Sequence, residues 1–276
     1  METRYCSETP CSVFRSPRRS FLLLMAGSLM IGMAGLALHA RPARAAVRNR
    51  PMARELSEMT TRMSDVEATV HVTKFDSVEA EKIGQDFKRT YSLRNITLQY
   101  KQPDKLRIDG RSAIFGSAVL ILNGATRFYN VPKLHIHKFE DLGNSPGKRQ
   151  SLLEYSGLIS PDTLRYMKGS FVREESVDGQ TALVYDLNYT GMEGGSHYRL
   201  WVDPRTHITI KRAWFDASNN LRATFFYLDP LEISPGIWLP TRVDIKNSEG
   251  ATAVSSAYSD LKVNQGLADN LFSVTQ

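Results

Sequence analysis

The sequence predicts a mainly β protein. We expect a curled antiparallel sheet, an unclosed half-barrel of about 10–11 strands, covered by an N-terminal helix and a central helical lid. Short segments of alternating apolar and polar residues fill most of the chain, separated by turns such as Asn123-Gly124. Apolar residues recur at helical spacing in only two places, 50–63 and 151–168. Because the apolar face of such a sheet must be covered, we expect these helices to lie across it.

The first 45 residues predict an export signal. Arg18 and Arg19 precede an apolar run and resemble a twin-arginine signal. Ala43 and Ala45 form a small-x-small site for signal peptidase, so we expect cleavage after Ala45.

The chain would then consist of a signal, residues 1–45, and a single half-barrel domain, residues 46–276. The alternative is an uncleaved membrane anchor, because the apolar run of 18 residues at 21–38 almost suffices to span a bilayer.

The composition of the remaining chain excludes several classes of function. The first 45 residues carry a net charge of +4 out of +6, so the rest carries only +2, too little to indicate a nucleic-acid partner. Cys6 and Cys11 both precede the apolar run, so the processed chain has no thiol for disulfides, catalysis or lipid attachment. About 230 residues remain, enough for one all-β domain with a sizeable core. We expect a monomer that is exported to the periplasm and soluble there.

The N-terminal half of this domain predicts a helix followed by hairpins. Met52, Leu56, Met59 and Met63 share one helical face, which predicts a helix over 50–63. Strands are then predicted over 66–75, 87–100, 105–109, 113–122, 126–130 and 134–139.

The C-terminal half begins with the helical insertion. Ser160-Pro161-Asp162 is a helix start, and two short helices are expected near 150–157 and 161–168. Strands are predicted over 171–177, 181–190, 197–203, 207–215, 221–229, 237–247 and 252–263, followed by a short apolar turn at 267–272.

The aromatic-rich strands from 197 to 230 offer a surface rather than a reactive group. Apolar side chains of this kind suit acyl chains, at about 0.8 kcal/mol for each buried methylene. The residues expected to line a ligand cavity on the concave face are Leu106, Ile108, Tyr198, Leu200, Ile208, Ile210, Trp214, Val243 and Ile245. The residues expected to form the lid are Leu152, Leu153, Leu158, Ile159, Leu164 and Met167.

Motifs for catalysis or cofactor binding are missing from the sequence. It has no nucleophile elbow and no glycine pattern for phosphates or dinucleotides. His135 and His137 share a strand face, but a metal needs three or four ligands and no second His or Cys cluster exists, which favours solvated histidines. We expect no cofactor, no metal and no enzymatic activity; a hydrolase using scattered carboxylates is the remaining catalytic alternative.

Several segments, in order, resemble the LolA-type outer-membrane lipoprotein-sorting family. The matching residues are Gln102 to Ile108, Asn123-Gly124 with Phe128-Tyr129, Gly179 to Tyr185, Leu200 to Pro204, Asp216, and Val263 to Leu267 with Leu271-Phe272. The resemblance implies an open half-barrel with a helical lid, acting as a periplasmic carrier of lipoprotein acyl chains or lipids towards the outer membrane.

The resemblance also implies partners: an inner-membrane lipoprotein-releasing transporter and an outer-membrane acceptor. Carriers of this family have a lid-fastening arginine before the matching proline, and this chain has Gln102 there. The superfamily also includes sensors of mislocalised lipoproteins and carriers of glycolipids. A regulatory module that senses periplasmic lipids or lipoproteins is therefore the alternative function.

Overall fold

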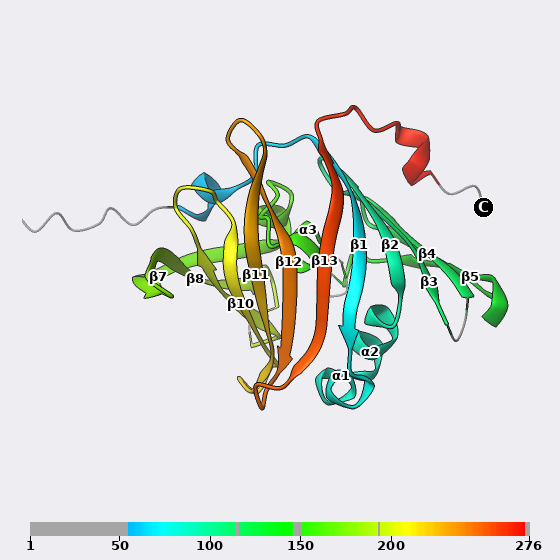
Figure 1. The fold of residues 1–276 in the computed structure, drawn as a ribbon, viewed down its shortest axis with the longest axis horizontal. Coiled ribbons are helices and arrows are strands. Elements are labelled where there is room, and N and C mark those ends of the chain that lie inside the picture. Colours follow the sequence, from blue (N-terminus) through cyan, green and yellow to red (C-terminus); the bar gives the residue numbers. More distant parts are fainter. Residues whose placement is uncertain (1–54, 114–115, 146–148, 150, 193, 274–276) are drawn as a thin grey trace, which may run out of the picture. The chain divides into compact units, whose positions relative to one another are not determined.

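The computed structural model describes residues 55–113, 116–145, 149, 151–192 and 194–273 (Figure 1). The chain divides into two compact units, Met1–Asn49 and Arg50–Gln276, and the fold below is that of the second. The signal residues Arg18, Arg19, Ala43 and Ala45 lie outside the described part. No helix within the described part is both long and apolar enough to cross a membrane.

One antiparallel sheet contains all the named strands, in the order β6-β5-β4-β3-β2-β1-β13-β12-β11-β10-β9-β8-β7. The strands are β1 (Asp65–Phe75), β2 (Arg94–Lys101), β3 (Lys105–Ser112), β4 (Gly116–Asn123), β5 (Thr126–Val131), β6 (Ile136–Asp141), β7 (Met167–Val177), β8 (Gln180–Tyr189), β9 (His197–Val202), β10 (Thr209–Phe215), β11 (Leu221–Ser234), β12 (Ile237–Asn247) and β13 (Thr252–Val263). The prediction of a mainly β, unclosed antiparallel sheet is confirmed, with 13 strands instead of the expected 10–11.

The helices are short. They are η1 (Leu56–Met59), α1 (Ser77–Ile83), α2 (Gln85–Tyr91), η2 (Pro132–Leu134), α3 (Leu152–Ser156), α4 (Thr163–Tyr166) and η4 (Asp269–Phe272). The two helices expected in the central insertion are α3 and α4, so that prediction is confirmed. The hydroxyl of Ser160 accepts a hydrogen bond from the Thr163 amide at 3.3 Å, which supports the start of α4.

The strand predicted from Phe87 onwards is wrong in its first part, because residues 85–91 form α2. Helix α1 precedes α2 and begins at Ser77. It begins there because the Asp76 carboxylate accepts hydrogen bonds from the amides of Val78 and Glu79, at 3.0 and 3.2 Å. In α2, Phe87 and Tyr91 are four residues apart and their rings lie 4.4 Å apart, packed against the core.

The helix predicted over 50–63 is wrong beyond Met59, since only the 3-10 turn η1 forms in its described part. The next residues are extended and take their backbone partners elsewhere: the Thr61 amide donates to the Ile159 carbonyl at 2.8 Å. The apolar spacing still serves packing, because Leu56, Met59 and Met63 are all buried.

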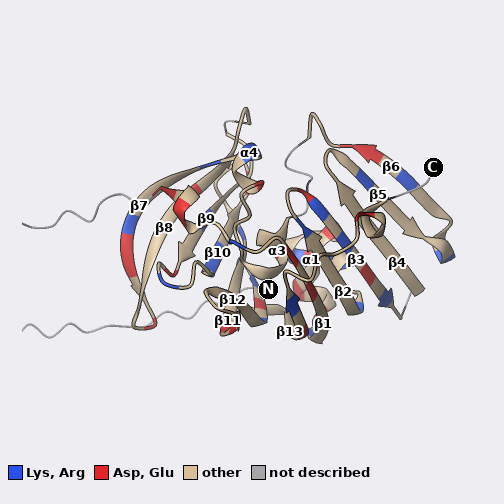
Figure 2. Cartoon of the chain, turned by 90° about the horizontal axis from the view of Figure 1, so that it is seen from above, with Lys and Arg blue, Asp and Glu red and all other residues tan. Residues whose placement is uncertain are grey.

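The strand order makes the helical insertion cross the sheet. Strands β6 and β7 are consecutive in sequence but lie at opposite edges. Residues 151–166, which contain α3 and α4 and are called the lid below, lie between these two strands in the sequence. Figure 2 shows α3 between the two arms of the sheet, β1–β6 on one side and β7–β13 on the other.

Candidate functional site

The lid covers most of the predicted lining residues. Two buried clusters form beneath it. The larger contains Leu106, Ile108, Ile208, Val243 and Ile245; the smaller contains Tyr198 and Leu200; Trp214 packs against both. Eight of the nine predicted lining residues are thus brought together on one face of the sheet.

Ile210 lies on the other face of the sheet, so its predicted position is wrong. It packs against a separate cluster that includes Val184, Trp201 and Ala213. The reason is a β-bulge: Thr209 pairs with Val202, but Lys211 already pairs with Trp201. The extra residue, Ile210, breaks the alternation that the sequence suggested.

The lid residues enter both clusters. Leu152 and Leu158 belong to the larger cluster, whereas Leu153, Ile159 and Met167 belong to the smaller, against which Leu164 also packs. Met167 is the first residue of β7 rather than a helical residue. Because neighbouring residues of α3 point into different clusters, this one helix holds the two halves of the apolar face together.

Hydrogen bonds fasten α3 and its C-terminal turn to the sheet. The Tyr227 hydroxyl donates to the Leu153 carbonyl at 2.8 Å, and the Tyr258 hydroxyl donates to the Tyr155 carbonyl. The Thr209 amide donates to the Gly157 carbonyl at 3.1 Å. The lid is therefore attached through its backbone carbonyls.

Gly157 is required where α3 ends. Its φ is +68°, in the left-handed region that favours glycine. A Cβ added there would lie 2.7 Å from Cγ of the Tyr227 ring, so the ring leaves no room for a side chain. The same tyrosine thus packs against the end of α3 and binds its carbonyl.

Gln102, the expected lid-latch position, is bonded to another segment. Its side-chain amide donates to the Met63 carbonyl at 2.6 Å, and its backbone amide donates to the Ser64 carbonyl at 2.8 Å. Both bonds hold the residues before β1 against the β2–β3 turn.

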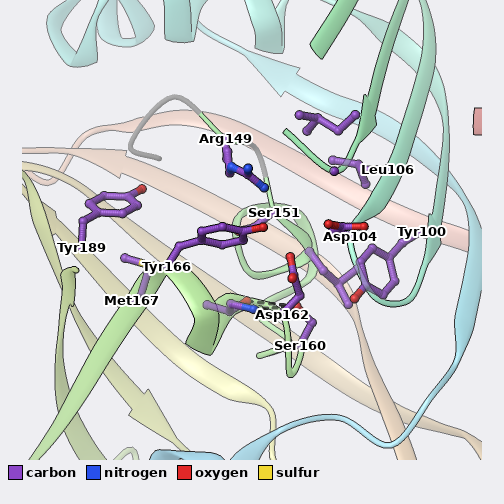
Figure 3. Close-up of a pocket in the computed structure, with 14 residues that line it drawn as sticks. Tyr100, Asp104, Leu106, Arg149, Ser151, Ser160, Asp162, Tyr166, Met167 and Tyr189 are labelled. Atoms are coloured by element: carbon purple, nitrogen blue, oxygen red, sulfur yellow. Dashed lines mark hydrogen bonds between the residues drawn. The ribbon is translucent and has the colours of Figure 1, made fainter. Parts of the chain in front are cut away.

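A small pocket remains between the lid and the β2–β3 and β4–β5 turns (Figure 3). Its volume is about 50 Å³, whereas pockets for lipid-sized ligands occupy roughly 300–1,000 Å³. Apolar residues such as Leu106, Leu122, Leu152 and Met167 line it. The lid side chains therefore leave little open volume in this pocket.

Charged groups surround this pocket. The guanidinium of Arg149 lies over the Tyr166 ring, 3.9 Å from its centroid. Burial, and then the negative charge of Asp104, raise the pKa of Asp162 to about 6. Arg165 lies 3.4 Å from the same carboxylate. Charged and apolar side chains thus both line this pocket.

The sequence analysis missed a buried cation beneath the lid. Arg212 is only 2% exposed and lies on β10 between the predicted lining residues. Its guanidinium lies 3.7 Å from the centroid of the Phe225 ring, and its Nε–H donates to the Tyr227 hydroxyl at 3.1 Å. The sequence did contain a signal for this position. Arg212 and Trp214 are two residues apart on one strand and therefore share a face, and Trp214 was assigned to the concave face.

Burial also affects the acid on α3. Desolvation raises the pKa of Glu154, while the positive charge of Arg212 opposes that shift. The Tyr189 and Tyr198 hydroxyls lie 3.1 Å apart in the same interior. The covered interior therefore contains polar groups of α3, β8, β9 and β10 beside its apolar side chains.

The two candidate metal-site histidines lie apart from this face. His135 is exposed, with a φ of +53°, and the ring of His137 packs edge-on against Phe128 at 5.0 Å. The described residues include no group of three His, Cys, Asp or Glu side chains arranged to hold a metal ion.

Known structures share this architecture. A domain of an outer membrane lipoprotein-sorting protein from Vibrio parahaemolyticus matches with a TM-score of 0.54 and 13% identity, over 79% of this chain and 92% of that one. A LolA superfamily protein from Nitrosomonas europaea matches with a TM-score of 0.52 and 15% identity, over 79% and 94%. The chain therefore shares its fold with these two structures.

The other comparisons add little about function. A DUF1329 family protein from Desulfovibrio piger is similar to this chain as well, with a TM-score of 0.52 and 15% identity, over 79% of this chain and 92% of that one. A family model described as an uncharacterized protein matches residues 150–276. No curated protein matches the chain. The predicted resemblance is confirmed at the level of the fold.

Proposed function

We propose that residues 46–276 form a periplasmic carrier, exported by the signal at 1–45, that encloses acyl chains of lipoproteins or lipids and transfers them towards the outer membrane. The observation that carries the proposal is the lid, which connects opposite edges of an open sheet and covers its apolar face. The LolA-type fold of the lipoprotein-sorting domain supports it.

The carrier works by exchanging lid contacts for acyl contacts. In the closed structure the lid leucines occupy the clusters that a ligand needs. Burying about 14 methylenes contributes roughly 11 kcal/mol, which offsets the loss of a few leucine side chains at about 1.5–3 kcal/mol each. Release follows when the lid leucines return to the clusters and the acyl chain moves to another apolar site.

A disulfide between the lid and the sheet tests this mechanism. Leu158 and Ile208 form an isolated antiparallel bridge, a pairing in which Cα atoms lie about 4.5–5.5 Å apart, within the range for a disulfide. Leu158→Cys with Ile208→Cys is made in a chain whose two native cysteines are replaced by serine. We expect the oxidised form to bind a fluorescent acyl probe at least about tenfold more weakly than the reduced form.

The matched control is a disulfide away from the lid. Asp244 and Ser255 pair directly between β12 and β13, so Asp244→Cys with Ser255→Cys carries an equivalent cross-link within the sheet. Its oxidation is expected to leave probe affinity unchanged. Equal affinity in both redox states of the lid variant, or a wild-type chain that carries no lipid in native mass spectra after purification from the periplasm, contradicts the proposal.

A further inference from the structure

The arginine beneath the lid has few partners for a buried cation. No carboxylate within the described part of the chain lies within 4.0 Å of the Arg212 guanidinium. Its neighbours are hydroxyl groups: Nε–H donates to the Tyr227 hydroxyl at 3.1 Å, and the Tyr198 hydroxyl lies close enough to accept from the guanidinium as well. A buried charge without an ion pair is costly, and that cost disappears when an anion binds to it.

Aromatic rings hold this guanidinium in place. The rings of Phe225 and Tyr198 lie 3.7 and 5.0 Å from it. Two residues further along β10, on the same face, the indole Nε1–H of Trp214 is buried and lacks an acceptor among the described residues. One strand thus presents to the covered interior a cation without an ion pair and an indole N–H without an acceptor among the described residues.

In the closed structure Arg212 is connected to the lid through Tyr227 of β11. The Tyr227 hydroxyl accepts from Arg212 and donates to the carbonyl of Leu153 in α3. When α3 leaves, Tyr227 loses its acceptor, and Arg212 faces the space that the leucines occupied. An oxyanion placed there can accept from the Tyr227 hydroxyl in place of the carbonyl and also from the guanidinium, which can bind it through two parallel hydrogen bonds.

We propose that Arg212 binds the acidic head group, carboxylate or phosphate, of a single-chain acyl lipid whose tail occupies the place of the lid side chains. This inference rests on the proposed carrier function and names its ligand class. The head group lies beneath the lid, beside β10, between the rings that flank Arg212. The carrier therefore prefers acidic acyl lipids to neutral ones of the same chain length.

Competition against a fluorescent acyl probe tests this preference. The ligands are oleate, oleoyl lysophosphatidic acid and the neutral oleyl alcohol, added below their critical micelle concentrations to the wild-type chain, Arg212→Met and Arg212→Lys. We expect the wild type to bind at least one of the two acids about tenfold to a hundredfold more tightly than the alcohol. Arg212→Met should remove this difference in affinity while it still binds the alcohol. Arg212→Lys should preserve part of the difference.

The matched control is Arg242→Met. Arg242 is exposed on β12, next to the lining residue Val243, and contacts Asp229 at 3.3 Å. The Arg242→Met substitution changes the net charge by the same amount as Arg212→Met and should leave the preference for acidic lipids intact. Comparing the acids shows whether the site takes a carboxylate, a phosphate or both.

The outcomes separate the two proposals. A wild-type chain that binds the alcohol as tightly as both acids overturns the head-group inference, whether or not Arg212→Met folds, and leaves the carrier function standing. Loss of the preference in Arg242→Met as well as in Arg212→Met also overturns it. Failure of all three ligands to bind the wild-type chain overturns both proposals.

Discussion

Replacing Gly157 by alanine changes the balance between the closed and the open lid. The new Cβ would lie 2.7 Å from Cγ of Tyr227 and 2.9 Å from its two Cδ atoms, closer than Cβ atoms are found to other atoms. The ring cannot retreat freely, because its hydroxyl is bonded to Leu153 on one side and Arg212 on the other.

The magnitude follows from two contributions. A left-handed conformation costs alanine about 1–2 kcal/mol, and relieving the contact costs on the order of another 1 kcal/mol by displacing the ring or the helix. Closure is then weakened by about 2–3 kcal/mol, or roughly 30- to 150-fold in the opening equilibrium. If an acyl chain binds only the open form, its affinity rises by up to the same factor, because less free energy is spent on opening.

Two measurements check this reasoning: hydrogen exchange of the amides in α3, which should become faster, and titration with a neutral acyl probe. Gly250→Ala is the matched control, because Gly250 has a φ of +84° but no atom within 4 Å of an added Cβ. Gly250→Ala introduces backbone strain in the β12–β13 turn without a steric contact, so it should leave the affinity for the acyl probe unchanged. Faster exchange in α3 without tighter binding would refute the view that lid opening limits affinity.

Three further predictions concern single side chains. Tyr227→Phe removes the bond to Leu153 and the acceptor for Arg212, so we expect the closed lid to weaken by about 1–3 kcal/mol, seen as faster exchange in α3. Because the pKa of Asp162 is raised to about 6 when the lid is closed, closure is favoured as the pH falls from 7 to 5 and is weakened as it rises through 6. A neutral acyl probe should therefore bind more weakly at pH 5 than at pH 7. Asp162→Asn should reduce this pH dependence of the affinity. Part of the dependence should persist, because the raised pKa of Glu154 acts in the same direction. Asp65 accepts from the amides of residues 265 and 266 at 2.8 and 3.0 Å, so Asp65→Ala should lower the free energy of unfolding by about 1–3 kcal/mol in denaturant titrations while probe affinity stays the same.

The sheet was predictable because its signals are local. Alternation and turn residues identify hairpins within a few residues; the hairpin at Asn123-Gly124 forms between β4 and β5 as expected. Helix α1 was missed although Asp76 and Glu79 have the spacing of a helix start, because the residues between the strands predicted over 66–75 and 87–100 were interpreted as a polar connection.

The centre of the site was harder to predict. A β-bulge adds one residue to a strand without a clear composition signal, so Ile210 was placed on the wrong face. Arg212 was passed over because a charged residue on a strand is usually solvated, and only the covering lid makes it a buried cation. Strand order across 200 residues, which brings the lid over that position, depends on pairings that local patterns do not reveal.

The direct passage from α4 into β7 has a mechanical consequence. Helix α4 ends at Tyr166, and β7, which forms one edge of the sheet, begins at Met167. No loop separates the two elements, so a displacement of this edge strand moves the end of α4 with it.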